Sequence, residues 1–227
     1  MKNLVVLTGA GISAQSGIKT FRDADGLWEG HDIMEVASPE GWHKNKELVL
    51  DFYNKRRAQL KEVQPNSAHK FLAYLEQYYK VHIITQNVDN LHERAGSNNV
   101  LHLHGELLKV RSTMDHNLIY HWENELVLGD LGTDNAQLRP HIVWFGEDVP
   151  LLETAASITE TADILVIIGT SMQVYPAASL IHSIKIGTPI YFIDPKPSIS
   201  KKSHPNLTII PKNAVDGMTE LVQLLTS

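Results

Sequence analysis

The sequence contains no cysteine in 227 residues. A disulfide framework, a thiolate metal site and a cysteine nucleophile are therefore excluded. Long hydrophobic runs are absent as well, since none approaches the roughly 20 apolar residues that cross a bilayer. Residues 1–3 lead directly into a short apolar segment, without the pattern of a signal peptide. We therefore expect a cytoplasmic protein that has no membrane segment and no membrane partner.

Positive charge is also scarce, because 20 Lys and Arg residues stand against 26 Asp and Glu residues and the formal net charge is −6. This balance argues against general binding to the phosphate backbone of nucleic acids. With 43% hydrophobic and 20% charged residues, the composition is that of an ordinary globular protein. The length suits one hydrophobic core, or one domain that carries an insertion.

A glycine-spaced motif stands near the N-terminus. An apolar run over residues 4–7 is followed by Gly9 and Gly11, and then by a segment near Ser13 that favours the start of a helix. Strand, glycine turn and helix in this order are typical of a dinucleotide-binding crossover, in which backbone amides and a helix dipole face a pyrophosphate. The motif alone is weak, because a tight turn needs glycine whether or not anything binds.

Apolar segments alternate with segments of helical period along most of the chain. The alternation predicts an α/β fold with a Rossmann-like parallel sheet and helices on both faces. The expected strands are residues 4–7, 81–85, 100–106, 164–168, 189–194 and 207–210. The expected helices are residues 45–61, 67–79, 151–161, 176–187 and 214–225.

Polar and small residues follow two of the expected strands. Gln86, Asn87 and Asp89 come directly after the strand at 81–85, and the small residues 169–171 follow a strand that is apolar throughout. Because the carboxyl ends of parallel strands share one edge, open α/β sheets bind their ligands there. The sequence therefore predicts a ligand site that both turns line.

Two histidines lie on one face of the strand at 100–106. A strand histidine is more often structural, and His102 is interpreted so. His104 ends the strand beside Gly105, and its reference pKa of about 6.5 suits a general base at neutral pH. His104 is therefore the stronger catalytic candidate.

The helix at 45–61 carries an arginine on its apolar face. Val49, Phe52, Tyr53 and Leu60 share that face with Arg56. One interpretation is an arginine whose stem covers apolar surface while its charge reaches water. The other is a guanidinium and a phenol that point together at a carboxylate. From the residues alone the first interpretation is favoured.

Residues 108–137 are rich in turns, with short strands expected at 118–122 and 125–128, and predict a small β module. Some of its side chains could bind a metal, but exposed polar residues on a hairpin are the favoured interpretation, because structural zinc needs four well-spaced ligands. The side chains in question are Asp115, His116, His121 and Glu123. The loop at 19–28 either closes over a ligand or is a plain connector with buried Phe21 and Trp28.

Five blocks of residues, taken in order, resemble a known family. The blocks are residues 9–13 with 16–18 and 20–22, residues 85–89 with 91–92 and 95–96, residues 104–106, residues 140–147, and residues 169–171 with Val174 and Pro176. Together they resemble the sirtuins, which are NAD-dependent protein-lysine deacylases, and the chain is most similar to the short bacterial members. Tyr53 and Arg56 match the Tyr-x-x-Arg motif of those that use malonyl- and succinyl-lysine, which reverses the interpretation of Arg56.

The resemblance implies NAD as co-substrate, acylated lysine side chains of proteins as partners, and a role for each matching residue. In the family the acyl oxygen attacks the ribose as nicotinamide leaves. His104 would then deprotonate a ribose hydroxyl, while Asn87 and Asp89 position ribose and nicotinamide. The products would be the free lysine and O-acyl-ADP-ribose. The implied NAD-binding residues are Gly9, Ala10, Gly11, Ser13, Phe21, Arg22, Trp28, Gln86, Asn87, Val88, Asp89, Gly169, Thr170, Ser171, Asp194, Lys196 and Ala214. The implied substrate-binding residues are Ala37, Tyr53, Arg56, Val143, Phe145, Gly146 and Glu147.

The chain departs from the family pattern in two respects. The family usually carries four zinc cysteines in its small module, so we expect a zinc-free module here, held by apolar side chains. These side chains are Leu118, Ile119, Trp122, Leu126 and Leu128. The family also usually has asparagine where Asp194 stands, and a carboxylate there would alter the affinity for NAD.

The expected NAD-binding domain comprises residues 1–28, 80–107 and 138–227, and the expected small domain comprises residues 29–79 and 108–137. A monomer is expected. Two further functions stay open at this point: an idle module that only binds NAD or ADP-ribose, and an NAD glycohydrolase or ADP-ribosyltransferase on the same fold.

Overall fold

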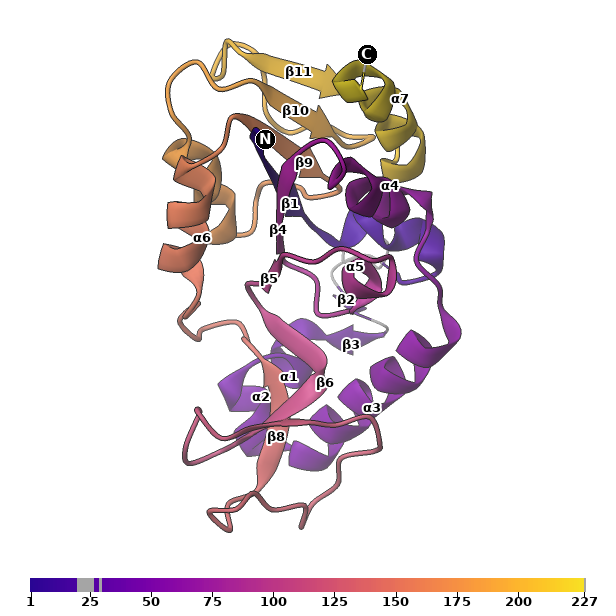
Figure 1. Cartoon of the computed structure of the whole chain (residues 1–227). Coiled ribbons are helices and arrows are strands. Elements are labelled where there is room, and N and C mark those ends of the chain that lie inside the picture. The colour runs from indigo at the N-terminus through magenta and orange to yellow at the C-terminus, as the bar shows by residue number, and fades with distance from the viewer. Residues whose placement is uncertain (20–26, 29, 227) are drawn as a thin grey trace.

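A parallel sheet forms the upper part of the molecule in the computed structural model, which describes residues 1–19, 27–28 and 30–226 (Figure 1). Its six strands follow the order β11-β10-β9-β1-β4-β5, and every neighbouring pair is parallel. The expected parallel α/β sheet is confirmed. The strands are β1 (Asn3–Thr8), β4 (Lys80–Thr85), β5 (Val100–His102), β9 (Ile164–Ile168), β10 (Ile190–Ile193) and β11 (Leu207–Ile210).

Helices cover both faces of this sheet (Figure 1). In β1, Leu4 and Val6 pack toward α4 (Ser67–Leu75) and α7 (Ala214–Thr226). Val5 and Leu7 pack toward the opposite face, where α6 (Leu152–Glu160) and the 3₁₀ segment η3 (Ala177–Ser183) lie. Side chains of a strand alternate between faces, so a strand that is apolar at every position needs cover on both.

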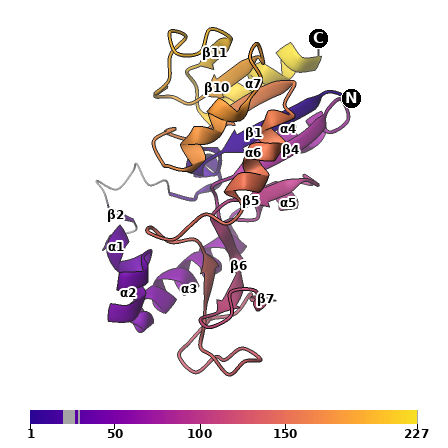
Figure 2. The ribbon, with the colours of Figure 1, turned by 90° about the vertical axis from the view of Figure 1, so that its left-hand side faces the viewer.

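A smaller unit lies below the sheet, as Figure 2 shows from the side. Its three-stranded antiparallel sheet has the order β7-β6-β8, and the helices α1 to α3 pack beside it. The strands are β6 (Gly105–Ser112), β7 (Ile119–His121) and β8 (Leu138–Ile142). The helices are α1 (Ile33–Val36), α2 (Pro39–Lys44) and α3 (Lys46–Glu62). Short elements between the two units are β2 (Leu27–Trp28), β3 (His31–Asp32) and α5 (Leu91–Arg94).

Some expected elements differ in the structure. The helix predicted to start near Ser13 is replaced by two 3₁₀ turns, η1 (Ala10–Ile12) and η2 (Ala14–Ser16), which end at Gly17 with a φ of 98°. The helix predicted for 176–187 is the shorter 3₁₀ segment η3. Residues 125–128 form no strand. The single expected strand at 100–106 is divided between β5 and β6, which belong to different sheets.

The small β module is held by polar as well as apolar contacts. Of the five apolar side chains expected to hold it, Leu126 is buried and Trp122 packs partly buried against the same cluster, but Ile119 and Leu128 are 43% and 46% exposed. Ser112 is fully buried, and its hydroxyl donates to Asp134 at 2.5 Å and accepts the backbone amides of residues 114 and 115. The Gln137 amide donates to three backbone carbonyls of the same module. Hydrogen bonds therefore stabilise this module where apolar packing alone was expected to do so.

The division between the two units follows the packing of two elements. The helix α4, expected in the small domain, packs on the large sheet. The strand β8, expected in the NAD-binding domain, pairs with β6. We therefore propose a boundary that assigns α4 to the large unit and β8 to the small one.

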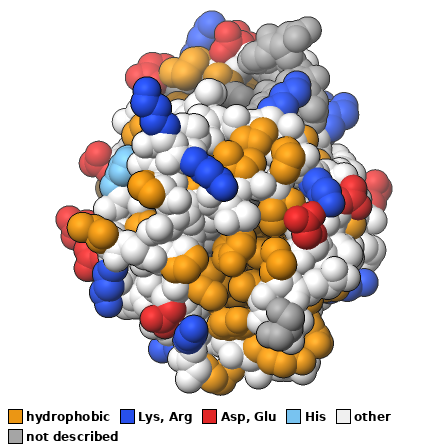
Figure 3. Space-filling model, turned by 90° about the horizontal axis from the view of Figure 1, so that it is seen from above, with side chains coloured by type: hydrophobic (Ala, Val, Ile, Leu, Met, Phe, Trp, Pro, Cys, Tyr) orange, Lys and Arg blue, Asp and Glu red, His pale blue; other side chains and the backbone are white. Residues whose placement is uncertain are grey.

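Seen from above, hydrophobic side chains gather near the centre of the face, and charged side chains of both signs are scattered around them (Figure 3). In the described part of the chain, none of the helices is long and apolar enough to traverse a bilayer.

Candidate functional site

The carboxyl ends of β1, β4 and β9 meet at one edge because β1 pairs with both other strands. The Gly9 amide donates to the Ile168 carbonyl at 3.0 Å, and the Gln86 amide donates to the Thr8 carbonyl at 2.9 Å. The glycine turn, the polar turn and the small-residue turn predicted from the sequence therefore lie side by side, at the edge where open α/β sheets bind ligands.

The glycines of this edge are needed first for packing between turns. A Cβ at Gly9 would lie 2.8 Å from the Gly169 carbonyl and from the Thr170 Cβ, and one at Gly11 would lie 2.6 Å from the Gly169 Cα. Gly169 itself has a φ of 60°, which disfavours other residues. The glycines therefore allow the two backbones to approach closely.

A buried polar network joins the first two turns. The Asn87 amide donates to the Gly9 carbonyl and to the Ser13 hydroxyl, each at 3.2 Å. Ser13 in turn donates to the Asp89 carboxylate at 3.0 Å, and the Leu91 amide donates to the other oxygen of Asp89 at 3.1 Å. Asp89 is 6% exposed, and burial raises its pKa. The network fixes the proposed catalytic amide and carboxylate against the glycine turn.

His104 sits at the same edge with a defined orientation. Its Nδ1 lies 3.1 Å from the Gln86 carbonyl oxygen, which can only accept, so Nδ1 carries the proton. The Nε2 atom of the neutral ring then has a free lone pair. Burial lowers the pKa of His104, which favours this neutral form. The carbonyl of His104 accepts the Val143 amide at 2.9 Å, which ties the predicted peptide segment to the predicted base.

Two buried histidines behind this edge were not found from the sequence. His92 contacts the Thr8 hydroxyl at 3.0 Å, and His69 contacts Ser13 at 3.4 Å. Their rings are 4.9 Å apart. Burial lowers the pKa of His69 to about 4 and that of His92 well below its usual value, so both rings are neutral. The signal in the sequence is that His69 falls on the apolar face of α4.

His102 is held in a different way. Both of its ring nitrogens face acceptors: Nδ1 is 3.0 Å from the Asn87 carbonyl, and Nε2 is 2.7 Å from the Glu93 carboxylate. Burial opposes its charged form, but the hydrogen bond to Glu93 outweighs burial and raises the pKa of His102. His102 therefore fixes the backbone of the polar turn, as a structural histidine would.

The remaining predicted NAD-binding residues lie around the same edge or beyond it. Gln86 donates to the Thr170 hydroxyl at 3.1 Å. The Ser171 carbonyl accepts the Ser198 hydroxyl. The Asp194 carboxylate is buried and accepts the Lys196 amide at 2.8 Å. The predicted residues Phe21 and Arg22 lie outside the described residues, as does the side chain of Trp28.

The acyl-pocket candidates gather on α3 in the small unit. The Tyr53 side chain is fully buried, and its hydroxyl accepts the indole N–H of Trp144 at 3.0 Å. The Arg56 guanidinium stacks on the Phe52 ring, 3.5 Å from its centre. Its positive charge favours a lower pKa of the Tyr53 phenol, against the larger effect of burial. The Ala37 carbonyl accepts the amide of Phe145. Tyr53, Arg56 and the predicted peptide segment therefore share one region.

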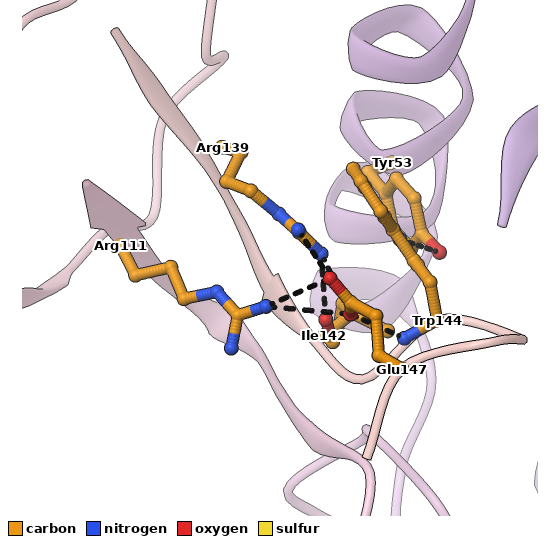
Figure 4. A network of polar contacts seen from close by, with 6 residues as sticks. All are labelled: Tyr53, Arg111, Arg139, Ile142, Trp144 and Glu147. Atoms are coloured by element: carbon orange, nitrogen blue, oxygen red, sulfur yellow. Dashed lines mark hydrogen bonds and ion pairs between the residues drawn. The ribbon is translucent and has the colours of Figure 1, made fainter. Parts of the chain in front are cut away.

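Glu147, predicted to bind substrate, turns inward (Figure 4). Its carboxylate accepts from the Arg139 guanidinium at 2.7 and 3.1 Å, from Arg111 at 3.3 Å and from the Trp144 amide at 2.8 Å. The pKa of Glu147 is lowered, because its bonds to the arginines outweigh its burial. Glu147 thus organises the 143–147 turn from behind.

A neighbouring arginine was missed. Arg57 is 1% exposed and donates to the Leu107 and Asn124 carbonyls and to Asn54. Burial lowers its pKa to about 10. It joins α3 to β6, whereas the sequence pattern drew attention to Arg56.

A family model describes the segment that holds these features. Residues 9–176 match the model of the Sir2 family. The chain belongs to the Sir2 family. It is 64% identical over 227 residues to an NAD-dependent protein deacylase of Helicobacter pylori (strain ATCC 700392 / 26695), covering 99% of this chain and 98% of the relative. It is 55% identical over 231 residues to an NAD-dependent protein deacylase of Bacteroides thetaiotaomicron, covering 99% and 98%. A solved Sir2 homolog–NAD complex has a TM-score of 0.87 at 41% identity, covering 99% of this chain and 90% of that one.

NAD is the co-substrate of the Sir2 family, and the residues at the carboxyl edge of this Sir2-family chain fit it. Hydroxyl, amide and carboxylate groups of Ser13, Asn87 and Asp89 converge beside the glycine turn. Such groups suit sugar hydroxyls and a nicotinamide amide. No group of three or more His, Cys, Asp or Glu residues in the described ranges is arranged to hold a metal. The candidates His121 and Glu123 pair with each other at 2.9 Å on the surface.

Proposed function

We propose that this chain is an NAD-dependent protein-lysine deacylase that releases nicotinamide and O-acyl-ADP-ribose. One observation carries the proposal. His104 presents an unprotonated Nε2 at the edge where the Ser13, Asn87 and Asp89 network meets the glycine turn. A neutral, buried imidazole in a defined tautomer is the form that a general base needs. The family and its named relatives support the same chemistry.

The residues divide the work by their positions. Bound NAD would supply a ribose whose anomeric carbon forms a bond to the acyl oxygen as its bond to nicotinamide breaks. Asn87 and Asp89 would orient the sugar and the amide of nicotinamide, and the turn at 9–13 would accommodate the pyrophosphate. His104 would take a proton from a ribose hydroxyl at Nε2. Because its Nδ1 stays bonded to the Gln86 carbonyl, the ring keeps its orientation during this transfer.

The peptide substrate is expected to extend the 143–146 segment as an added strand. Phe145 is 42% exposed on this segment, and Gly146 has a φ of 91°, as at a turn. The segment lies directly beside His104, since the Val143 amide is bonded to the His104 carbonyl. A peptide bound along this segment would bring its acylated lysine close to the base.

The assay that tests this function measures nicotinamide release with and without an acylated peptide. We expect release that depends on the peptide, and loss of that release in His104→Tyr. Release without peptide would identify an NAD glycohydrolase, and no release in either case would identify a binding module. Undiminished peptide turnover by His104→Tyr would contradict the role of His104.

The acyl group is proposed to be acidic, such as malonyl or succinyl, because Tyr53 and Arg56 lie together. A shielded arginine–carboxylate pair stabilises the bound state by about 2 kcal/mol. Arg56→Met is therefore expected to lower the ratio of desuccinylation to deacetylation at least tenfold. Values of kcat/KM for matched succinyl and acetyl peptides measure this ratio. An unchanged ratio would contradict an acidic acyl substrate.

A further inference from the structure

The hydrogen bond between Trp144 and Tyr53 is buried, and it can run in only one direction. Trp144 is 2% exposed and Tyr53 is fully buried, and the two residues lie 91 positions apart in the chain. An indole N–H can only donate, so the Tyr53 oxygen must be the acceptor at 3.0 Å. Figure 4 shows the Trp144 side chain reaching from the loop after β8 to the phenol on α3.

This contact determines where the phenol proton points. A phenol has one proton, and the direction of its lone pair toward Trp144 turns the O–H away from the indole. No acceptor for the Tyr53 O–H is found among residues 1–19, 27–28 and 30–226. Burial raises the pKa of Tyr53, so the proton stays on the phenol throughout the physiological range. The result is a directed donor that has no acceptor in the part of the chain that the structure describes.

Trp144 is itself held by several contacts. Its ring lies under the Arg139 guanidinium, 3.3 Å from the ring centre, and its centre is 5.8 Å from that of Trp42. Its backbone amide donates to Glu147, which Arg139 and Arg111 hold in turn. These contacts hold the indole independently of the phenol. A fixed donor on one side of a hydroxyl orients that hydroxyl.

We propose that Trp144 is a specificity-determining positioning residue, whose indole N–H aims the Tyr53 hydroxyl at the carboxylate of an acidic lysine acyl group. The inference rests on the proposed acidic acyl substrate and adds the residue that prepares the phenol for it. Trp144 also stands between Val143 and Phe145, so the segment proposed to bind the peptide carries the residue that orients the acyl pocket. Docking of the peptide and recognition of the acyl group are thereby coupled through one side chain.

The test compares Trp144→Phe, which removes the N–H and keeps an aromatic ring, with Tyr53→Phe. Each is expected to lower the succinyl-to-acetyl ratio of kcat/KM about tenfold, mainly through KM for the succinyl peptide. The double variant should match Tyr53→Phe alone, because without a phenol the indole has nothing to orient. Trp122→Phe is the matched control: it removes an indole N–H that donates to the Glu125 carbonyl rather than to Tyr53, and it should leave the ratio at the wild-type value.

Two results would overturn the proposal. One is a folded Trp144→Phe variant that keeps the wild-type succinyl-to-acetyl ratio while Arg56→Met lowers it. In that case the acidic-acyl function stands and only the role of Trp144 is contradicted. The other is a double variant whose loss is the product of the single losses. If Arg56→Met also keeps the wild-type ratio, the proposed acyl function itself has failed.

A measurement on the native Trp144 covers the case in which Trp144→Phe does not fold. The indole ¹H–¹⁵N signal of Trp144 is expected to shift in Tyr53→Phe and on binding of succinyl peptide, more than on binding of acetyl peptide. The other three of the chain's four tryptophans serve as internal references. A Trp144 signal that responds equally to both peptides would contradict the proposal.

Discussion

The tautomer of His104 depends on one backbone carbonyl. The carbonyl of Gln86 binds Nδ1, and burial opposes the charged ring, so two independent effects leave Nε2 free to take a proton. The sequence placed His104 at a strand end, but the acceptor comes from a turn 18 positions away. The neighbouring His102, at the end of β5, has the opposite shift because Glu93 reaches it.

The pH dependence of the reaction follows from the lowered pKa of His104. A base with a lowered pKa stays neutral to lower pH, and activity is lost only as the pH falls through that value. We expect the acidic limb of kcat/KM to lie below the reference histidine pKa of about 6.5. A pH profile, with an NMR titration of the His104 ring, measures it. An acidic limb above the reference histidine pKa would show that a group other than His104 controls it.

At the scale of elements, two turns determine the site by packing against each other. The turn after β1 and the turn after β9 approach so closely that a Cβ at Gly169 would lie 2.5 Å from the Ile12 amide nitrogen. Gly187 also has a positive φ, of 92°, but nothing lies within 4 Å of a Cβ there. A side chain at Gly187 would meet only backbone strain, whereas one at Gly169 would meet both strain and a steric clash. Comparing the two positions therefore separates the two effects on stability.

Gly169→Ala is expected to destabilise the fold by about 3 kcal/mol, because the strain of positive φ and the collision add. Gly187→Ala carries only the strain and should cost about 1 kcal/mol. Denaturant unfolding of both variants measures the difference. Equal losses would show that the two turns are free to separate.

At the scale of the whole molecule, the small unit is held together without a thiolate site. Buried Arg57 joins α3 to β6, and the Ser112 hydroxyl closes the module through Asp134. These contacts are available in the absence of cysteine, and they suit a module with little apolar surface of its own.

The stability of this unit should therefore not respond to metal removal. We expect the same Tm before and after treatment with a chelator, and Ser112→Ala to cost about 2 kcal/mol by leaving two backbone amides unpaired. Ser203→Ala, at an exposed position, is the control and should leave Tm unchanged. Thermal unfolding and elemental analysis test this, and stoichiometric zinc would contradict a zinc-free module.

Predictions from local signals are confirmed. The uniform apolar run of β9 is a strand covered on both faces, and the turns after β1, β4 and β9 lie at one edge of the sheet, as expected. Predictions that depended on distant partners were wrong. The turn after β1 became 3₁₀ rather than α-helical, and Ile119 and Leu128 remained exposed because nothing covers them.

The sequence by itself determined the order of the strands along the chain, the glycine turn and the choice of residues for the chemistry, because periodicity and residue type act over a few positions. Only the tertiary structure decided which groups are neutral, which are oriented and which are held. Tyr53 shows the reason: its hydroxyl is aimed by an indole 91 positions away, and such a contact exists only once the fold has brought α3 and the loop after β8 together.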